Sequence, residues 1–422
     1  MKHSLATKFK PANIKLRGDK AIWILLILLS IISAVEVFSA VASEVYFDKN
    51  AQTPTAYFVK HIIMLSFGIV VAYVFQNFKY SLLPHFLNAL MILSFILVVG
   101  AFATGMYYKY AYPDPNMFKS LKMGRWIPLP AGFSFQPAEM AKFITIMWMA
   151  WKTTVFKDKL KLWETFKKIM IPVCIMCVAI GASNLSTAII IFTTTTIVLF
   201  IAGIPKRYLA IVFSATAVLF ICIMLLAKTV PGIDKVPPFG RFTTAASRTS
   251  ATKTDDPTQQ RHQAKLAIGN AGIIGLGVGN SVMAHNQREA QNDFVFMVIT
   301  EETGLLGAIS VILLFMILIY RCFYIARHSA GFFGSMLCYS IGLILTIQAL
   351  IHIGVSTGLI PVTGQTLPFV SKGGTSILFA CMALGVVLNV STTYDKKEKD
   401  AVSDNNDTET ADSTNTKPAT AD

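Results

Sequence analysis

The stretch AIWILLILLSIISAVEVFSAVASE (residues 21–44) is apolar over a length that crosses a lipid bilayer, which takes roughly 20 residues. Runs of this kind recur along the 422 residues, of which 54% are hydrophobic and only 14% are charged. A soluble protein averages about 25% charged residues, so a large soluble protein with buried helices is a poor fit. The sequence therefore predicts an all-α polytopic membrane protein. Because the first run is too long for a signal peptide and lacks a small-residue cleavage site, we expect it to be retained.

We expect about ten transmembrane helices, one for each apolar run. Only Ser183 and Asn184 separate the fifth run from the sixth. A large external loop joins the seventh helix to the eighth. The predicted spans lie near residues 21–44, 57–76, 81–103, 138–156, 169–183, 185–203, 207–228, 294–320, 333–357 and 374–393.

Basic residues indicate the orientation, because short cytoplasmic loops are enriched in Lys and Arg. With ten spans, the basic clusters at the N-terminus (1–20) and after spans four, six, eight and ten fall on one side. Both termini are therefore predicted to be cytoplasmic, and 21–393 to form the membrane domain. Residues 394–422 are polar and acidic, so they are predicted to be a disordered cytoplasmic tail. The basic residues counted are Lys2, Lys8, Lys10, Lys15, Arg17, Lys20, Lys157, Lys159, Lys161, Lys167, Lys168, Lys206, Arg207, Arg321, Arg327, Lys396, Lys397 and Lys399.

Three segments, about 104–137, 229–292 and 358–373, are then external. The middle one is long and basic, and long loops usually carry function. It holds seven basic residues, Arg241 among them, against four acidic ones. Long external loops are exempt from the positive-inside rule. The excess therefore indicates either attraction to anionic headgroups or a negatively charged substrate at the outer surface.

The stretch GRWIPLPAGFSFQPAEMAKF (124–143) leads from the first external segment into span four. Glu139 and Lys142 stand three residues apart, so they share a helix face near the outer membrane boundary. They either form a self-neutralising anchor or serve function, since ionisable groups inside a membrane are functional candidates. Trp126 fits an interfacial belt residue equally well.

Two stretches are rich in glycine or proline. GNAGIIGLGVGNS (269–281) suits either close approach of backbone amides to phosphate or close packing of a re-entrant segment. GLIPVTGQTLPFVSKGGTSIL (358–378) precedes the last span. Irregular backbone at membrane depth is tolerated where it lines a cavity, so we expect this stretch to form one wall of a polar cavity that opens outward.

The stretch NDFVFMVITEETG (292–304) opens span eight with Asp293 and carries Glu301 and Glu302 further along. A carboxylate at the centre of a membrane helix costs about 2.5–3.5 kcal/mol on insertion scales. On a helix, Glu302 lies opposite Asp293 and Glu301 about 80° away, so we expect the glutamates to pair inside the bundle and to be structural.

These four stretches, in this order, resemble the SEDS family (shape, elongation, division and sporulation), the FtsW/RodA type of membrane protein. The resemblance covers about residues 20–393 and is slightly stronger to the division and sporulation members (FtsW) in GQTLP (364–368). It implies ten transmembrane helices and a peptidoglycan glycosyltransferase that uses lipid II at the outer face of the bacterial cytoplasmic membrane. It also implies a class B penicillin-binding protein as partner.

The resemblance assigns the family's essential acid to Asp293, and it places Trp126, Glu139 and Lys142 in the same outward cavity. The chain departs from the family pattern at several positions, which makes the cavity more cationic without removing Asp293. Further substrate-binding candidates are Arg125, Gln136, Arg241, Gln263, Asn280, Ser281 and Ser371. The departures are Arg288 for Pro, Gln291 and Asn292 for His-Thr, Ser183 and Asn184 for Pro-Asp, Lys372 for Tyr, and His352 for Asn.

In this interpretation Asp293 takes the proton of a sugar 4-hydroxyl, since general base catalysis contributes about 10²–10⁴-fold. Lys142 and Arg241 would stabilise the pyrophosphate leaving group. A divalent ion such as Mg²⁺ could assist, although no metal-ligand pattern reveals it. Two other classes stay open: a lipid II flippase and a non-catalytic scaffold among other division proteins at the septum. Nothing in the sequence indicates a nucleic-acid partner.

Overall fold

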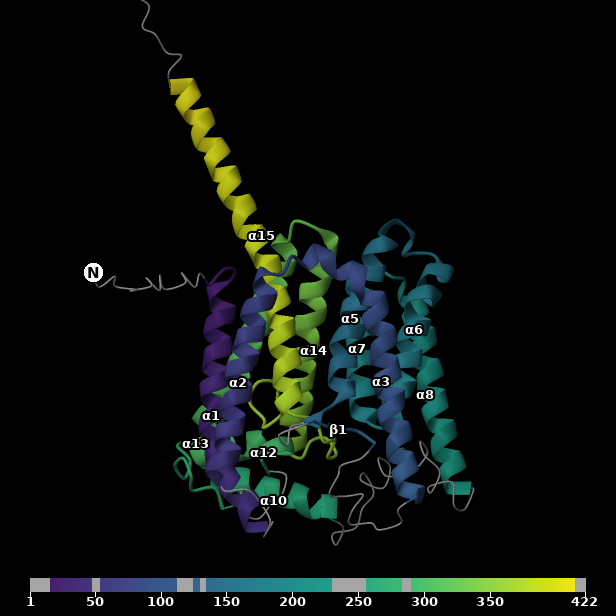
Figure 1. Cartoon of the computed structure of the whole chain (residues 1–422), viewed down its shortest axis with the longest axis vertical. Helices are drawn as coiled ribbons and strands as arrows, with labels where there is room; N and C mark the ends of the chain where they lie inside the picture. The colour runs from purple at the N-terminus through teal and green to yellow at the C-terminus, as the bar shows by residue number, and fades with distance from the viewer. Residues whose placement is uncertain are drawn as a thin grey trace, which may run out of the picture.

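The computed structural model describes residues 16–47, 54–111, 124–129, 134–229, 256–282 and 290–413. Within these ranges the fold is a bundle of long helices that run side by side (Figure 1). Ten helices of the described chain have 17 or more residues. They are α1 (Lys20–Phe47), α2 (Pro54–Asn77), α3 (Leu83–Ala111), α5 (Pro137–Val155), α6 (Trp163–Gly181), α7 (Leu185–Ile201), α8 (Lys206–Thr229), α13 (Val295–His328), α14 (Phe332–Ser356) and α15 (Gly374–Ser413).

The remaining described elements are short. Helix α10 (Asp256–Asn270) and the four-residue α12 (Ala290–Asp293) precede α13, and two 3-10 turns, η1 (Tyr80–Leu82) and η3 (Lys157–Lys159), follow α2 and α5. Strands β1 (Ile127–Pro128) and β2 (Ser134–Phe135) form an antiparallel pair before α5. The predicted all-α class is confirmed.

Within the described residues, six helices are long and apolar enough to cross a membrane: α1, α2, α3, α13, α14 and α15. Helix α5 is not among them because its 19 residues include three charged ones, Glu139, Lys142 and Lys152. Helix α7 is apolar but has only 17 residues. The chain is therefore a polytopic membrane protein. Its exact number of crossings stays a prediction.

Helices α14 and α15 form the centre of the bundle. In the most apolar 18-residue stretch of each helix, 72% of the residues of α14 and 83% of those of α15 are buried, against 22% in α2 and 28% in α3. The outer helices instead expose large apolar side chains, such as Phe67 and Val74 of α2 and Phe86 and Ile96 of α3. Such faces suit hydrocarbon, which supplies no partner for polar groups.

The two ends of the bundle differ in composition. At one end, Arg321 of α13 pairs with Asp19, and Lys157 lies 5.2 Å from the ring centre of Phe332. The predicted cytoplasmic clusters around spans one, four and eight therefore lie together. At the other end, drawn lowest in Figure 1, lie α10, α12 and β1. The glycine- and proline-rich segments thus occupy the end opposite the basic turns.

Helix α15 continues to Ser413, whereas the sequence predicts a disordered tail from residue 394. Extending a formed helix adds one hydrogen bond per residue without a new nucleus, and the Lys and Glu residues after Tyr394 favour helix. Residues 414–422 lie outside the described chain.

A kink in α13 explains the glycine-rich stretch 269–281. Gly304 adopts φ 70° and ψ −165° within the helix, and its backbone packs directly on the segment around Gly275. Leu276 N donates to Glu301 O at 2.9 Å, and Leu305 N donates to Gly272 O at 3.1 Å. Of the two interpretations of this stretch, the structure supports close backbone packing.

Replacing Gly304 by Ala is therefore expected to destabilise the fold by at least about 2 kcal/mol, because the new Cβ would overlap the carbonyl of Ile273 at a positive φ. The measurement is thermal unfolding of the purified full chain in detergent. Gly269→Ala is the matched control, since its Cβ would meet nothing within 4 Å. Equal melting temperatures for the two variants would contradict this account of the kink.

Candidate functional site

Asp293 ends the short helix α12, immediately before the start of α13. Its carboxylate lies against Gly364: a Cβ on that glycine would stand 3.5 Å from Asp293 Oδ2. Gly364 has φ +66°, a conformation that side chains other than glycine rarely adopt. The segment 358–373 therefore lies next to the Asp293 carboxylate at Gly364.

Ser371 holds the same segment to α12. Its hydroxyl donates to Asn292 O at 2.8 Å and accepts from Leu367 N at 2.8 Å. Ser371 is 1% exposed. The predicted site residues Asp293 and Ser371 are thus brought together, with Ser371 fixing the residue next to the acid.

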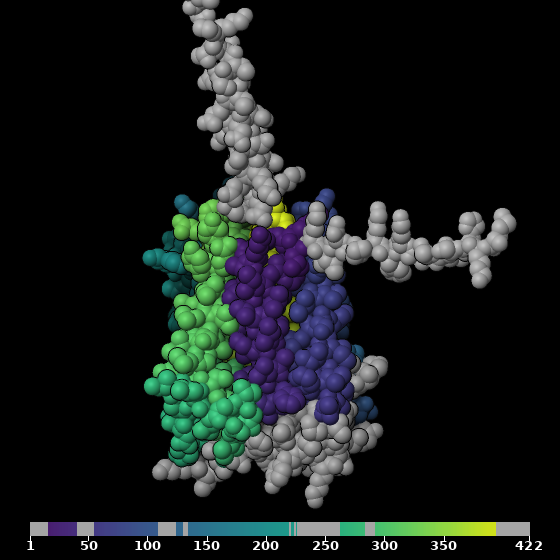
Figure 2. Space-filling view, turned by 90° about the vertical axis from the view of Figure 1, so that its left-hand side faces the viewer, coloured from purple at the N-terminus to yellow at the C-terminus, as the bar shows by residue number. Residues whose placement is uncertain are grey.

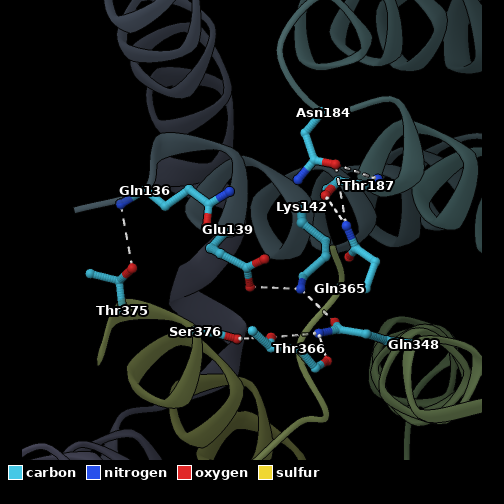
Figure 3. Close-up of polar contacts among 10 residues, drawn as sticks. All are labelled: Gln136, Glu139, Lys142, Asn184, Thr187, Gln348, Gln365, Thr366, Thr375 and Ser376. Atoms are coloured by element: carbon cyan, nitrogen blue, oxygen red, sulfur yellow. Dashed lines mark hydrogen bonds and ion pairs between the residues drawn. The ribbon is translucent and has the colours of Figure 1, made fainter. Parts of the chain in front are cut away.

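Lys142 is fully buried inside the bundle and lies between two acceptors, as Figure 3 shows. Its ammonium donates to Glu139 Oε2 at 2.7 Å and to Gln348 Oε1 at 2.6 Å. Gln348 in turn donates to Thr366 O at 2.8 Å, and Thr366 Oγ1 lies 3.1 Å from Ser376 Oγ. One hydrogen-bonded chain thus joins α5, α14, the segment 358–373 and α15.

From the sequence, Lys142 was predicted to stabilise the negative charge of the leaving pyrophosphate. In the structure its hydrogen bonds go to Glu139 and Gln348, and its side chain is 1% exposed. Lys142 and Asp293 are therefore both linked to the segment 358–373. Lys142 is linked through Gln348, which bonds Thr366, and the Asp293 carboxylate lies next to Gly364. This geometry favours a positioning role for Lys142.

A second amide network holds Gln365. Its Nε2 lies 3.2 Å from both Asn184 Oδ1 and Thr187 Oγ1 at the start of α7. Its carbonyl lies 2.7 Å from His352 Nδ1, while Phe296 N donates to His352 Nε2 at 3.4 Å. His352 is therefore neutral, with its proton on Nδ1. Two departures from the family pattern, Asn184 and His352, contact the same glutamine.

Four residues of this cluster were not predicted as site residues from the sequence: Gln348, His352, Gln365 and Thr366. Gln348 and His352 stand four residues apart on α14, which places them on one face of an otherwise apolar helix. That spacing could have indicated Gln348 and His352 from the sequence. The position of Gln365 could not be predicted, because it lies in irregular backbone.

The residues that lead into α5 also contact elements around the site. Arg125 Nε donates to Ser183 O at 2.8 Å, and Gln136 N donates to Thr375 Oγ1 at 3.3 Å at the start of α15. Trp126 is half-buried and immediately precedes β1. Arg125 and Gln136 therefore connect the residues on either side of the β1–β2 hairpin to the α6–α7 turn and to α15.

Other predicted residues lie apart from this cluster. The hydroxyl of Ser281 donates to Glu301, and the exposed Asn280 bonds Leu276 O within the glycine-rich turn at 3.0 Å. Gln263 lies half-buried on α10. Arg241 and Arg288 fall outside the described residues.

Glu301 and Glu302 are each 1% exposed. Glu301 accepts from Ser281 and from Val282 N, and Glu302 accepts from Ser39 of α1. Both are thus buried in the bundle and hydrogen-bonded within it, which fits the predicted structural role. Lys372 sits 4.0 Å from the ring centre of Tyr57. Among the described residues, no group of three or more His, Cys, Asp or Glu side chains is arranged to hold a metal ion.

Replacing Glu139 by Gln is expected to destabilise the protein by about 3–5 kcal/mol, because it leaves Lys142 as a buried charge without its counter-ion. The double variant Glu139→Gln/Lys142→Met is expected to recover part of that loss. Denaturation of the full chain in detergent measures both. The control is Glu164→Gln, which removes an exposed pair with Lys167 at the same spacing and should leave the melting temperature unchanged. A double variant no more stable than the single one would contradict this electrostatic explanation.

The chain resembles known proteins in sequence along most of its length. The chain is 30% identical over 379 residues to a probable peptidoglycan glycosyltransferase FtsW of Coxiella burnetii, covering 87% of this chain and 95% of the relative. It is 29% identical over 390 residues to stage V sporulation protein E of Bacillus subtilis, covering 89% of this chain and 98% of the relative.

Two solved structures share the architecture. A chain of a peptidoglycan synthase complex aligns with a TM-score of 0.67 at 20% identity, over 90% of this chain and 99% of its own length. The rod shape determining protein RodA of Thermus thermophilus aligns with a TM-score of 0.57 at 18% identity, over 89% of this chain and 96% of its own. The profile of the FtsW/RodA/SpoVE family, described as cell cycle protein, matches residues 19–396, so the chain belongs to that family.

Proposed function

We propose that this protein is a peptidoglycan glycosyltransferase that polymerises lipid II at the outer face of the bacterial cytoplasmic membrane. The observation that carries the proposal is the position of Asp293, whose carboxylate lies against Gly364 in the segment that Gln348 and Lys142 hold from the other side. The names of the relatives support this reaction class. The orientation, with both termini cytoplasmic, follows from the basic clusters.

In the proposed reaction, the acceptor 4-hydroxyl attacks the donor C1, and the bond from C1 to the lipid pyrophosphate breaks. Asp293 accepts the hydroxyl proton as the new glycosidic bond forms. Ser371 and Gly364 fix the acid, since one bonds the residue before it and the other leaves room for its carboxylate. The basic loop that includes Arg241 supplies positive charge for the leaving pyrophosphate.

The proposal extends to partners and location. A class B penicillin-binding protein would crosslink the strands as they form, in keeping with the peptidoglycan synthase complex among the structural neighbours. The FtsW names of the relatives support a role in septal cell-wall synthesis, with other division proteins as partners.

Asp293→Asn is expected to lower glycan polymerisation by about 10²–10⁴-fold, because the amide cannot accept the hydroxyl proton. Purified full chain, with and without the penicillin-binding partner, is incubated with lipid II in detergent, and glycan length is measured by gel electrophoresis. Asp158→Asn, an exposed acid in the turn after α5, is the matched control and should leave polymerisation intact.

The same assay separates the enzyme from a flippase. Detergent removes the two leaflets, so a polymerase still makes glycan while a flippase has no transport to perform. Absence of polymer with every partner tested, together with movement of labelled lipid II across vesicle membranes, would assign the protein to transport.

Lys142→Met is expected to reduce polymerisation strongly, because Gln348 then loses the donor that orients it against Thr366. Lys142→Arg keeps the charge but not the geometry of a compact ammonium, so it should rescue in part. Lys159→Met, an exposed cytoplasmic change, is the control. Full activity of Lys142→Met would reduce Lys142 to a helix anchor.

A further inference from the structure

The imidazole of His352, on α14, joins two pieces of main chain that lie next to Asp293. The ring is fully buried. Its Nδ1 lies 2.7 Å from the carbonyl oxygen of Gln365, and its Nε2 accepts from the main-chain N–H of Phe296 at 3.4 Å. A ring that accepts at Nε2 and faces a carbonyl at Nδ1 carries its proton on Nδ1. One neutral side chain therefore donates to the first piece and accepts from the second.

The bond to Phe296 completes the first turn of α13. Phe296 is the second residue of that helix, and N–H groups of a first turn have no acceptor within their own helix. The residue at the N-cap position is Phe294, which supplies no side-chain acceptor. Both phenylalanines are buried, and a buried N–H without a partner is costly. The imidazole thus caps α13 from a neighbouring helix.

The bond to Gln365 fixes the main chain that faces the Asp293 carboxylate. Gln365 directly follows Gly364, against which that carboxylate lies. On the other side of the glycine, the carbonyl oxygen of Thr363 accepts from the hydroxyl of Ser186 at 3.1 Å. The two residues next to Gly364 are therefore held by side chains of two different helices, α7 and α14. The imidazole is the one of these that also reaches α13.

The main chain that carries Asp293 is tied down on both sides of the acid. Before it, the carbonyl oxygen of Asn292 accepts from the hydroxyl of Ser371 at 2.8 Å. After it, the N–H of Phe296 is bonded to His352. The half-buried carboxylate is thus placed by the main chain that bears it and by the main chain that it faces. His352 is bonded to both.

Packing between helices places α13 as a whole. Helix α13 contacts α14 along its length, and it also contacts α1, which Figure 2 shows in purple against the green surface of the chain around α13. Such packing fixes the helix axis and depends on many side chains. The bond from His352 instead acts on the first turn, three residues after Asp293, where a small shift of the main chain redirects the carboxylate.

We propose that His352 is a positioning residue for Asp293: its neutral imidazole fixes the first turn of α13 relative to Gln365 and so sets where the carboxylate points. The fully buried ring acts through Asp293 and does not touch substrate. The bridge itself is independent of the reaction catalysed. Only its effect on turnover rests on the proposed glycosyltransferase function.

Two substitutions at this position separate bridging from packing. Asparagine and leucine have nearly the same size and shape, but only the asparagine amide can donate a hydrogen bond. In His352→Asn the amide can replace Nδ1 toward Gln365, but it is too short to reach Phe296. His352→Leu makes neither bond. A role in packing alone predicts that leucine is tolerated at least as well as asparagine, whereas a bridging role predicts the reverse order.

Hydrogen–deuterium exchange of the full chain in detergent, measured by mass spectrometry of its peptides, tests the bridge without any enzymatic readout. In His352→Leu, exchange should become faster both in residues 294–298 and in residues 362–367. In His352→Asn it should become faster in residues 294–298 alone. His85→Leu is the matched control, because His85 is an exposed histidine of α3 whose Nδ1 lies 3.3 Å from a carbonyl of its own turn. Both segments should then exchange as in wild type.

Polymerisation of lipid II by the same variants tests positioning, with kcat expressed per folded protein. His352→Leu is expected to lower kcat by about 10²-fold, the loss that a displacement of about 1 Å at a catalytic group can cause. The kcat of His352→Asn should lie between those of His352→Leu and wild type. The KM for lipid II should stay near that of wild type, since an interaction that acts only in the transition state lowers kcat and kcat/KM together.

Unchanged exchange of both segments in His352→Leu would overturn the bridge. A wild-type kcat in His352→Leu, a kcat of His352→Asn no higher than that of His352→Leu, or a raised KM with unchanged kcat would overturn the positioning role. If His352→Leu does not fold, His352→Asn decides: faster exchange in 294–298 with a lower kcat supports the proposal, and wild-type behaviour in both contradicts it. If wild type makes no polymer while exchange responds as expected, the bridge stands and the proposed function falls.

Discussion

An irregular backbone inside a helical membrane bundle has to find hydrogen-bond donors for its carbonyl groups, because hydrocarbon offers none. The segment 358–373 meets this requirement with side chains from three helices, each directed at a main-chain oxygen. The four contacts are Ser33 of α1 to Val370 O at 2.8 Å, Ser186 of α7 to Thr363 O at 3.1 Å, Gln348 of α14 to Thr366 O at 2.8 Å and His352 of α14 to Gln365 O at 2.7 Å. The site exists because these donors fix the segment.

The buried ammonium of Lys142 follows from the same constraint. Gln348 can present its Nε2 to Thr366 only while its Oε1 faces Lys142, and Lys142 can be buried only while Glu139 balances its charge. The ion pair on α5 thus determines the rotamer of a glutamine on α14. The fully buried position of Lys142 is therefore better explained by this orienting role than by direct contact with a substrate.

Hydropathy was sufficient to locate the long helices, because each needs a run of apolar residues whatever its neighbours are. It was less accurate at helix ends. Helix α6 begins at Trp163 rather than near 169, since a helix can extend beyond the hydrocarbon with charged residues such as Lys167 on its surface. In the site, the motifs indicated Asp293, Glu139, Lys142 and Ser371, and these do converge on one segment.

Residues whose position depends on irregular backbone could not be placed in the same way. Asn280 and Ser281 were grouped with the substrate site, yet their turn is fixed by the contact of Gly275 with the kink at Gly304. That contact joins two backbones that no helical or strand periodicity relates. The hydrogen bond from Ser39 of α1 to Glu302 is of the same kind, because an acid in a span indicates that a partner exists but not which residue it is.

The bundle holds its buried acids in two different ways, and the difference has consequences. Glu139 is balanced by a lysine three residues away on its own helix, so the pair moves as one unit with α5. Glu302 of α13 instead accepts a hydrogen bond from Ser39 of α1, so the contact that holds this acid also holds α1 against α13. A charge balanced within one helix reaches a neighbouring helix only through a further contact, here the hydrogen bond from Lys142 to Gln348. An acid held between helices ties the position of α1, which also packs on the short helix α12 that carries Asp293, to that one contact.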